Sequence, residues 1–190
     1  MIASAPSKTP KKSRKGRYMN LRLLSIVVMV VAAAFSRLIP HPWNFTAVGA
    51  MALFGGTYLS SKRMSLLVPM AALLLSDLAL GMHNVMLFVY GAFALNVILG
   101  WTLKDSRSIP RIGGVTVLSS ALFFVITNFG MWFMGSMYPK TVAGLVECYV
   151  AAIPFFGNQV AGDVFYVALM FGAFEAVKKY VPEMSAVQNG

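Results

Sequence analysis

The side chains that could bind a polar solute gather near one end of the apolar segments of this chain. They are carboxylates, amides, aromatic rings, two histidines and one arginine: Arg37, His41, Asn44, Asp77, His83, Asn128, Trp132, Gln159, Asp163 and Tyr166. Three of them, Gln159, Asp163 and Tyr166, share one helix face because they are spaced i, i+4 and i+7. The collection predicts a pocket that opens on one side of a membrane and binds a polar organic solute.

Two aspartates and one arginine stand at a similar depth inside the apolar segments. An arginine without a partner at that depth costs roughly 3 kcal/mol or more. We therefore expect Arg37 to contact Asp77 or Asp163, and the pair to form the floor of the pocket. The walls would consist of Asn128, Trp132, Gln159 and Tyr166. In the alternative interpretation, the ion pair only locks helices together.

No motif of a known catalytic site occurs in the 190 residues. The sequence lacks Gly-x-Ser-x-Gly, a phosphate-binding loop and a Gly-x-Gly-x-x-Gly that opens a helix. His41 and His83 lack the spacing of paired zinc ligands, and the single cysteine, Cys148, excludes an internal disulfide and a cysteine-based metal cluster. We therefore expect no enzyme, no cofactor and no metal. A metal-dependent intramembrane enzyme that uses His41, His83 and Asp77 is the least supported hypothesis.

The composition is typical of an integral membrane protein. Apolar residues make up 58% of the chain and charged residues 12%, which is about half the charged share of a soluble domain. The formal charge is +10, but the basic residues gather in an N-terminal tail and beside the apolar runs. Such positions indicate membrane orientation and contact with anionic lipid, so we expect no nucleic-acid partner.

Six apolar segments predict an all-α bundle of six transmembrane helices. They span 21–39, 44–59, 64–81, 84–103, 115–134 and 158–180. Asn44 is expected to cap the second helix. The stretch Thr141–Ile153 lies between two prolines and is too short to cross about 30 Å, so it is predicted to form a separate lid helix over the outer mouth of the bundle.

The positions of the basic residues set the predicted orientation. With the N-terminus in the cytoplasm, all 16 Lys and Arg residues fall inside except Arg37 and Lys140, as the positive-inside rule requires. We expect a multi-pass protein of the bacterial cytoplasmic (inner) membrane with both termini cytoplasmic. The predicted parts are a disordered basic tail at 1–20, the transmembrane domain at 21–180 and a tail at 181–190. Alternatively, the basic start and the apolar run 23–34 form a cleaved signal peptide.

Several stretches resemble a family of small bacterial membrane proteins of unassigned function: Ser36–Thr46, Leu53–Gly56, Ser76–Gly81, Thr127–Gly130, Met137–Thr141 and Gly162–Tyr166. Over residues 21–180 that family is similar to the substrate-binding S components of energy-coupling-factor (ECF) transporters, especially the small solitary cobalamin type. The resemblance implies a six-helix fold that captures a vitamin from the outside. A shared ECF energising module would be the partner.

Two features depart from the S-component pattern. Many S components carry an Ala-x-x-x-Ala pair for docking the energising module, whereas the first helix here offers only Ala32-x-x-x-Ser36. The cobalamin type binds cobalt through a cysteine, and Cys148 does not align with that position. The sequence thus predicts the substrate-binding membrane component of a small-nutrient uptake transporter for a vitamin-type ligand. The alternative is a structural membrane subunit whose outer polar residues only pack helices.

Overall fold

A computed structural model describes residues 12–181 of the chain. Within that range the chain forms six α-helices and one short 3-10 helix, without a strand. The elements are α1 (Lys12–Phe35), η1 (Ser36–Leu38), α2 (Val48–Tyr58), α3 (Lys62–Leu80), α4 (Met86–Trp101), α5 (Ile109–Met134) and α6 (Val142–Tyr180). The predicted all-α bundle of six helices is therefore confirmed.

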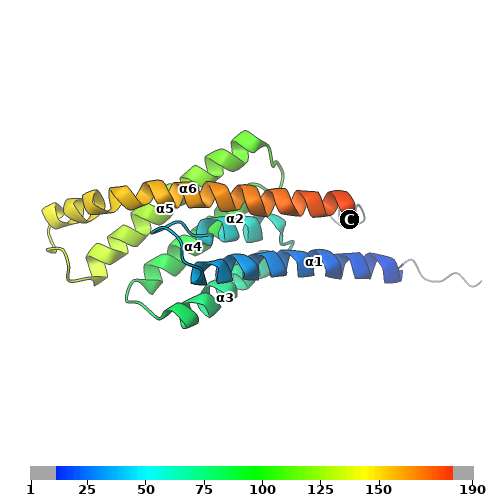
Figure 1. The fold of residues 1–190 in the computed structure, drawn as a ribbon, viewed down its shortest axis with the longest axis horizontal. Helices are drawn as coiled ribbons and strands as arrows, with labels where there is room; N and C mark the ends of the chain where they lie inside the picture. The colour runs from blue at the N-terminus through cyan, green and yellow to red at the C-terminus, as the bar shows by residue number, and fades with distance from the viewer. Residues whose placement is uncertain (1–11, 182–190) are drawn as a thin grey trace, which may run out of the picture.

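The bundle has two distinct ends (Figure 1). The start of α1 and the end of α6 lie at the same end, which also holds the connections 59–61 and 102–108; we call it the terminal end. The connections 36–47, 81–85 and 135–141 lie toward the other end, which we call the loop end. The α5–α6 hairpin projects beyond the other helices at the loop end.

Helix α2 forms the centre of the bundle. It has only 11 residues, all of them buried, and it contacts each of the other five α-helices. A helix that is apolar on every side is stable only when it is surrounded. Glycines permit the contact: Gly56 meets Gly100 of α4 backbone to backbone, and a Cβ on either residue would collide with the other helix.

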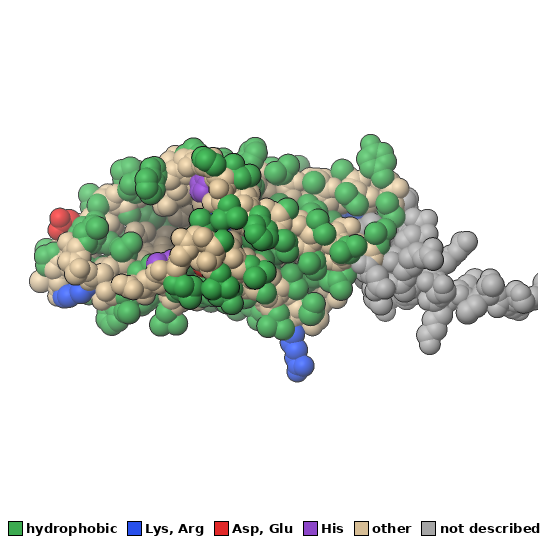
Figure 2. All heavy atoms as spheres, turned by 60° about the horizontal axis from the view of Figure 1, so that its bottom comes forward, with side chains coloured by type: hydrophobic (Ala, Val, Ile, Leu, Met, Phe, Trp, Pro, Cys, Tyr) green, Lys and Arg blue, Asp and Glu red, His purple; other side chains and the backbone are tan. Residues whose placement is uncertain are grey.

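Among the described residues, four helices are long and apolar enough to cross a membrane: α1, α3, α5 and α6. The apolar helix α4 is shorter, with 16 residues. Leucine, valine, isoleucine and phenylalanine side chains cover much of the outside, and Figure 2 shows this surface with only a few charged groups. An exposed apolar surface of this extent suits contact with lipid acyl chains.

The structure changes several predicted boundaries. Helix α1 already begins at Lys12, inside the range 1–20 that we expected to be a disordered tail, and α5 begins at Ile109 instead of 115. Residues 1–11 and 182–190 of the two predicted tails lie outside the described residues. The second helix starts at Val48 rather than 44, because Asn44 adopts a positive φ of 61° that no helix accommodates. Asn44 is therefore not the cap of α2, whose N-cap position is Ala47.

The predicted separate lid helix is also wrong. Residues 142–153 are the first turns of α6, a single helix of 39 residues that runs through Pro154. Such a helix is about 58 Å long, and its first turns extend the α5–α6 hairpin instead of crossing the mouth of the bundle. A proline removes one helical hydrogen bond, and membrane helices tolerate that loss when their neighbours hold the helix in place.

Candidate functional site

A cavity of about 290 Å³ lies between the helices toward the loop end. The helices α2 to α6, the short helix η1 and two connections contribute to it, and Figure 2 shows a hollow on this face with histidine side chains beside it. Its lining consists of Arg37, Asn44, Thr46, Val48, Leu73, His83, Val85, Val89, Phe123, Thr127, Asn128, Met131 and Gln159. Five of the predicted site residues are among them: Arg37, Asn44, His83, Asn128 and Gln159.

The short length of α2 creates this space. The chain leaves η1 and runs as a loop from Ile39 to Ala47 before α2 begins at the buried Val48. Phe45 anchors the loop, since its backbone lies against Gly162 of α6 and its ring packs on Tyr166 at 5.9 Å between centroids. The loop thus stands where the first turns of a longer second helix would lie, and its polar residues Asn44 and Thr46 line the cavity.

An ion pair fixes the arginine of the cavity. Arg37 Nη1 donates to Asp77 Oδ1 at 2.6 Å and to Ser76 Oγ at 2.5 Å. The other carboxylate oxygen of Asp77 accepts from the Tyr90 hydroxyl at 2.9 Å. Asp77 is 1% exposed, so its charge is balanced by Arg37 rather than by water. The predicted contact between Arg37 and an aspartate is confirmed, with Asp77 as the partner.

Asp163 has a different position from the one expected. Its carboxylate is buried and accepts from Ser120 Oγ of α5 at 2.6 Å. It also meets the backbone N–H groups of Gly49 and Ala50 in the first turn of α2. No side chain of α2 itself caps this end, so Asp163 supplies from α6 the acceptor that an N-cap residue normally provides. It does not line the cavity.

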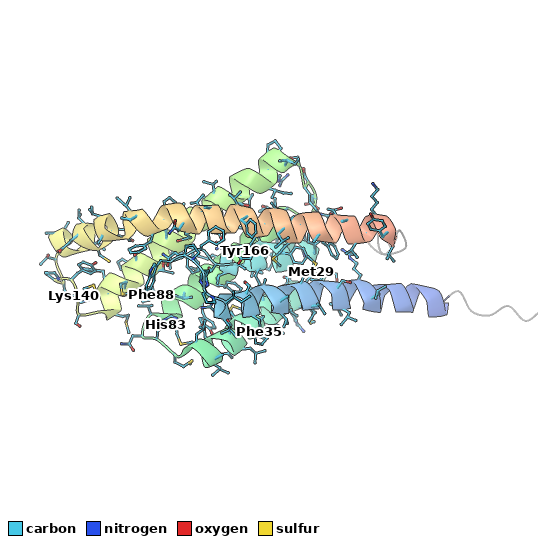
Figure 3. All side chains as sticks on the ribbon, viewed as in Figure 1. Met29, Phe35, His83, Phe88, Lys140 and Tyr166 are labelled. Carbon is cyan, nitrogen blue, oxygen red and sulfur yellow. The ribbon has the colours of Figure 1, made fainter. Side chains whose placement is uncertain are left out.

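Four more predicted site residues do not line the cavity. Asp77 is buried behind Arg37, and His41 is exposed, with Nδ1 2.6 Å from the carbonyl oxygen of Ile39. Trp132 lies in the last turn of α5, and its Nε1 donates to the Pro139 carbonyl of the α5–α6 connection at 2.9 Å. Tyr166 lies on the α1 side of α6. Figure 3 shows it close to Met29 and apart from His83.

The amide side chains of the cavity use their nitrogen atoms within the protein. Asn128 Nδ2 donates to the Phe124 carbonyl at 2.8 Å, and Gln159 Nε2 donates to the Ser120 carbonyl at 2.9 Å. Their side-chain oxygens are thus the atoms available to a ligand. Arg37 makes its described hydrogen bonds through Nη1, which leaves Nε and Nη2 as donors.

Sequence reasoning missed the apolar wall of the cavity and a second cavity beside it. Val89, Phe123 and Met131 line the first cavity, but apolar residues on a membrane helix carry no signal that separates a cavity wall from a lipid-facing side. The second cavity, of about 270 Å³, shares Asn44, Asn128 and Met131 with the first and contains Cys148. The shared residues separate two hollows along the α5–α6 hairpin.

The amino-acid sequence matches that of a protein family. The model of a family of unknown function (DUF6580) matches residues 17–184, which is most of the chain, so the protein belongs to that family. No curated protein and no solved structure matches the sequence.

Proposed function

We propose that this member of the DUF6580 family is the substrate-binding membrane component of a small-nutrient uptake system. The observation that carries the proposal is the cavity of about 290 Å³, whose polar wall is built on the Arg37–Asp77 ion pair. A structural bundle gains nothing from an open volume at this position, because unfilled space forfeits packing energy. A concave site with a few converging polar groups is instead typical of small-molecule binding.

The polar atoms of the cavity suit a ligand with both donors and acceptors. Arg37 offers N–H donors to an anionic or carbonyl oxygen, while the side-chain oxygens of Asn128 and Gln159 accept from N–H or O–H groups. The volume of about 290 Å³ lies just below the roughly 300–1,000 Å³ of pockets for drug-sized ligands. This supports a small vitamin-type solute and disfavours cobalamin in this conformation, because a corrinoid is much larger than the cavity.

The location that we propose is the bacterial inner membrane, with the loop end facing outward. All Lys and Arg residues except Arg37 and Lys140 then lie on the cytoplasmic side, in accordance with the positive-inside rule. Both termini are cytoplasmic in this arrangement, and the ligand enters from outside. Energy for uptake would come from a partner such as an ECF module, because the chain has no nucleotide-binding motif of its own.

A structural membrane subunit is the second candidate function. It is favoured by the number of polar groups that the protein already uses internally: Asp77 is paired, Asp163 caps α2, and Trp132 binds the turn to α6. These groups were expected to belong to the pocket, and each of them has a packing role instead. Under this alternative the cavity would contain only water or detergent.

The test is the identification of small molecules that co-purify with the protein. The full chain is extracted in a mild detergent, washed extensively and denatured, and the released compounds are identified by mass spectrometry. The proposal expects a stoichiometric organic solute small enough for the cavity. A preparation that releases no such solute but retains a second membrane protein would favour the structural alternative.

A further inference from the structure

We propose that the terminal end of the bundle holds a binding site for a phosphate group, formed by Arg22, Arg107 and Lys178 around Tyr58. The site is separate from the cavity of the loop end and does not depend on the function proposed for it. Its residues come from α1, the α4–α5 connection, α6 and the last turn of α2. They approach one another only in the folded bundle.

Contacts to Tyr58 bring the three cations together. Arg22 Nη2 donates to the Tyr58 carbonyl at 3.4 Å. The Arg107 guanidinium lies 5.1 Å from the centre of the Tyr58 ring, and Lys178 Nζ lies 5.7 Å from it. The Tyr58 hydroxyl donates to Glu175 Oε1 at 2.7 Å. Three cations and one carboxylate thus contact a single residue, two of the cations through its ring and Arg22 through its carbonyl oxygen.

The carboxylate does not neutralise this cluster. Glu175 pairs with Lys178 at 2.6 Å and accepts from Tyr58, while neither arginine has an ion-pair partner among residues 12–181. The chain has six acidic residues, and none of the other described ones pairs with this cluster. Asp105 lies two residues before Arg107 in the same connection without an ion pair to it, while Asp77, Glu147 and Asp163 belong to α3 and α6. Two guanidinium groups therefore lack an ion pair in the described part of the protein, and Glu175 is the one nearby carboxylate that they share with Lys178.

Burial makes the missing counter-charge costly. Arg22 is 8% exposed, and the Nε atoms of Arg22 and Arg107 are buried without a hydrogen-bond partner among the described residues. The C-terminus of α2 offsets part of the charge, since Tyr58 and Leu59 direct carbonyl oxygens at Arg22 and Lys104. A helix C-terminus amounts to about half a negative charge, which is less than the two uncompensated guanidinium groups require.

A phosphate group supplies what the cluster lacks. It carries one or two negative charges, and its oxygens accept from guanidinium groups in a bidentate manner. The described bonds of Arg22 and Arg107 to the protein use only Nη2 of each, so Nη1 and Nε remain as donors. Basic sites between transmembrane helices at the cytoplasmic surface are suited to the headgroups of anionic lipids. Lipid phosphate and free inorganic phosphate share this chemistry.

The test compares melting temperatures of the full-length protein in nanodiscs. The discs contain phosphatidylcholine alone, phosphatidylcholine with added inorganic phosphate, or a mixture with phosphatidylglycerol. The proposal expects a rise of several degrees with an anionic probe. A rise only with phosphatidylglycerol identifies a lipid headgroup, and a rise only with inorganic phosphate identifies the free ion. Equal melting temperatures under all three conditions would overturn the proposal.

Two matched variants locate the effect. Arg107→Gln should abolish the rise, whereas Arg111→Gln, which changes an exposed arginine in the first turn of α5, should retain it. A rise of the same size in Arg107→Gln would mean that the anion acts elsewhere, and would refute the site. The variants need not be as stable as the wild type. The measured quantity is the rise in melting temperature of each protein between discs of phosphatidylcholine alone and discs with the anionic probe.

The remaining acidic residue, Glu183, lies outside the described residues, and Glu183→Gln tests whether the chain's own tail is the counter-charge. The phosphate proposal expects the anionic probe to raise the melting temperature of this variant by the same amount as that of the wild type. If the anionic probe raised the melting temperature of Glu183→Gln but not that of the wild type, Glu183 would be the group that occupies the basic cluster. That result would contradict the proposal.

Discussion

Removal of the Asp163 carboxylate tests the role that the structure gives to this residue. In Asp163→Ala, the backbone N–H groups of Gly49 and Ala50 lose the acceptor that they meet at the start of α2, and the Ser120 hydroxyl loses a bond of 2.6 Å. Because α2 is surrounded by the other five helices, water cannot readily replace that acceptor. The expected result is a destabilised bundle.

The magnitude follows from the contacts that are lost. An N-cap contributes about 0.5–2 kcal/mol, and each buried polar group left without a partner costs about 1–3 kcal/mol. Ser120 keeps its bond to the Thr116 carbonyl, which limits its share. Relief from burying the carboxylate offsets part of the sum, so we expect a net loss of about 2–4 kcal/mol. By the scaling of soluble proteins of this size, the melting temperature falls by about 5–15 °C.

The assay is a thermal melt in detergent with two comparison variants. Asp163→Asn keeps an oxygen that can accept from α2 and should lose less than half as much stability as Asp163→Ala. Glu147→Ala removes an exposed carboxylate from the same helix and should melt as the wild type does. An Asp163→Ala protein that melts within about 1 °C of the wild type would refute the capping role, since even a weak cap contributes more.

Three further predictions concern the ion pair, a buried amide and the topology. Asp77→Asn leaves the partly exposed Arg37 without a counter-charge and should lower the free energy of unfolding by about 1–3 kcal/mol. Tyr90→Phe should lower it by less in the same melts, and the reverse order would contradict the pairing. Asn96 is fully buried, and neither of its amide atoms has a partner in the described structure. Asn96→Leu should therefore leave the melting temperature unchanged or raise it. A clear fall in the melting temperature would contradict the absence of a partner for this amide. Reporter fusions at residues 62, 104 and 190 should give cytoplasmic signals and fusions at 83 and 140 external ones, whereas an external C-terminus would exclude the proposed orientation.

The sequence was sufficient to predict the helical bundle and a contact between Arg37 and an aspartate. Both follow from strong free-energy penalties, for polar backbone in lipid and for an arginine without a partner. Such penalties leave few alternatives, so residue type and depth decide the outcome. The choice between two aspartates required the structure, because both lie at a similar depth.

Sequence reasoning failed where weaker preferences compete. An asparagine before an apolar run resembles a helix cap, but Asn44 belongs to the loop that enters the bundle, and α2 starts four residues later. Pro154 resembles a helix end, yet α6 is continuous through it, and contacts to α5 flank the proline: Phe156 packs on Phe124, and the Tyr149 hydroxyl donates to the Val125 carbonyl. The spacing of Gln159, Asp163 and Tyr166 predicts that they share one face of a pocket. In the folded bundle these three side chains have different neighbours, which a helix period alone does not specify.

The most direct measurement of the central claim compares ligand retention in two tryptophan variants of α4. Val89 lines the cavity, whereas Leu87 is 78% exposed on the outside of the same helix. Val89→Trp places bulk in the cavity, and Leu87→Trp adds the same side chain outside it. If the cavity binds the solute, then the amount of co-purified small molecule per protein falls at least about tenfold in Val89→Trp, equivalent to about 1.4 kcal/mol of binding free energy. Leu87→Trp retains the wild-type amount. Equal retention by both variants, with both proteins folded, would contradict binding in the cavity.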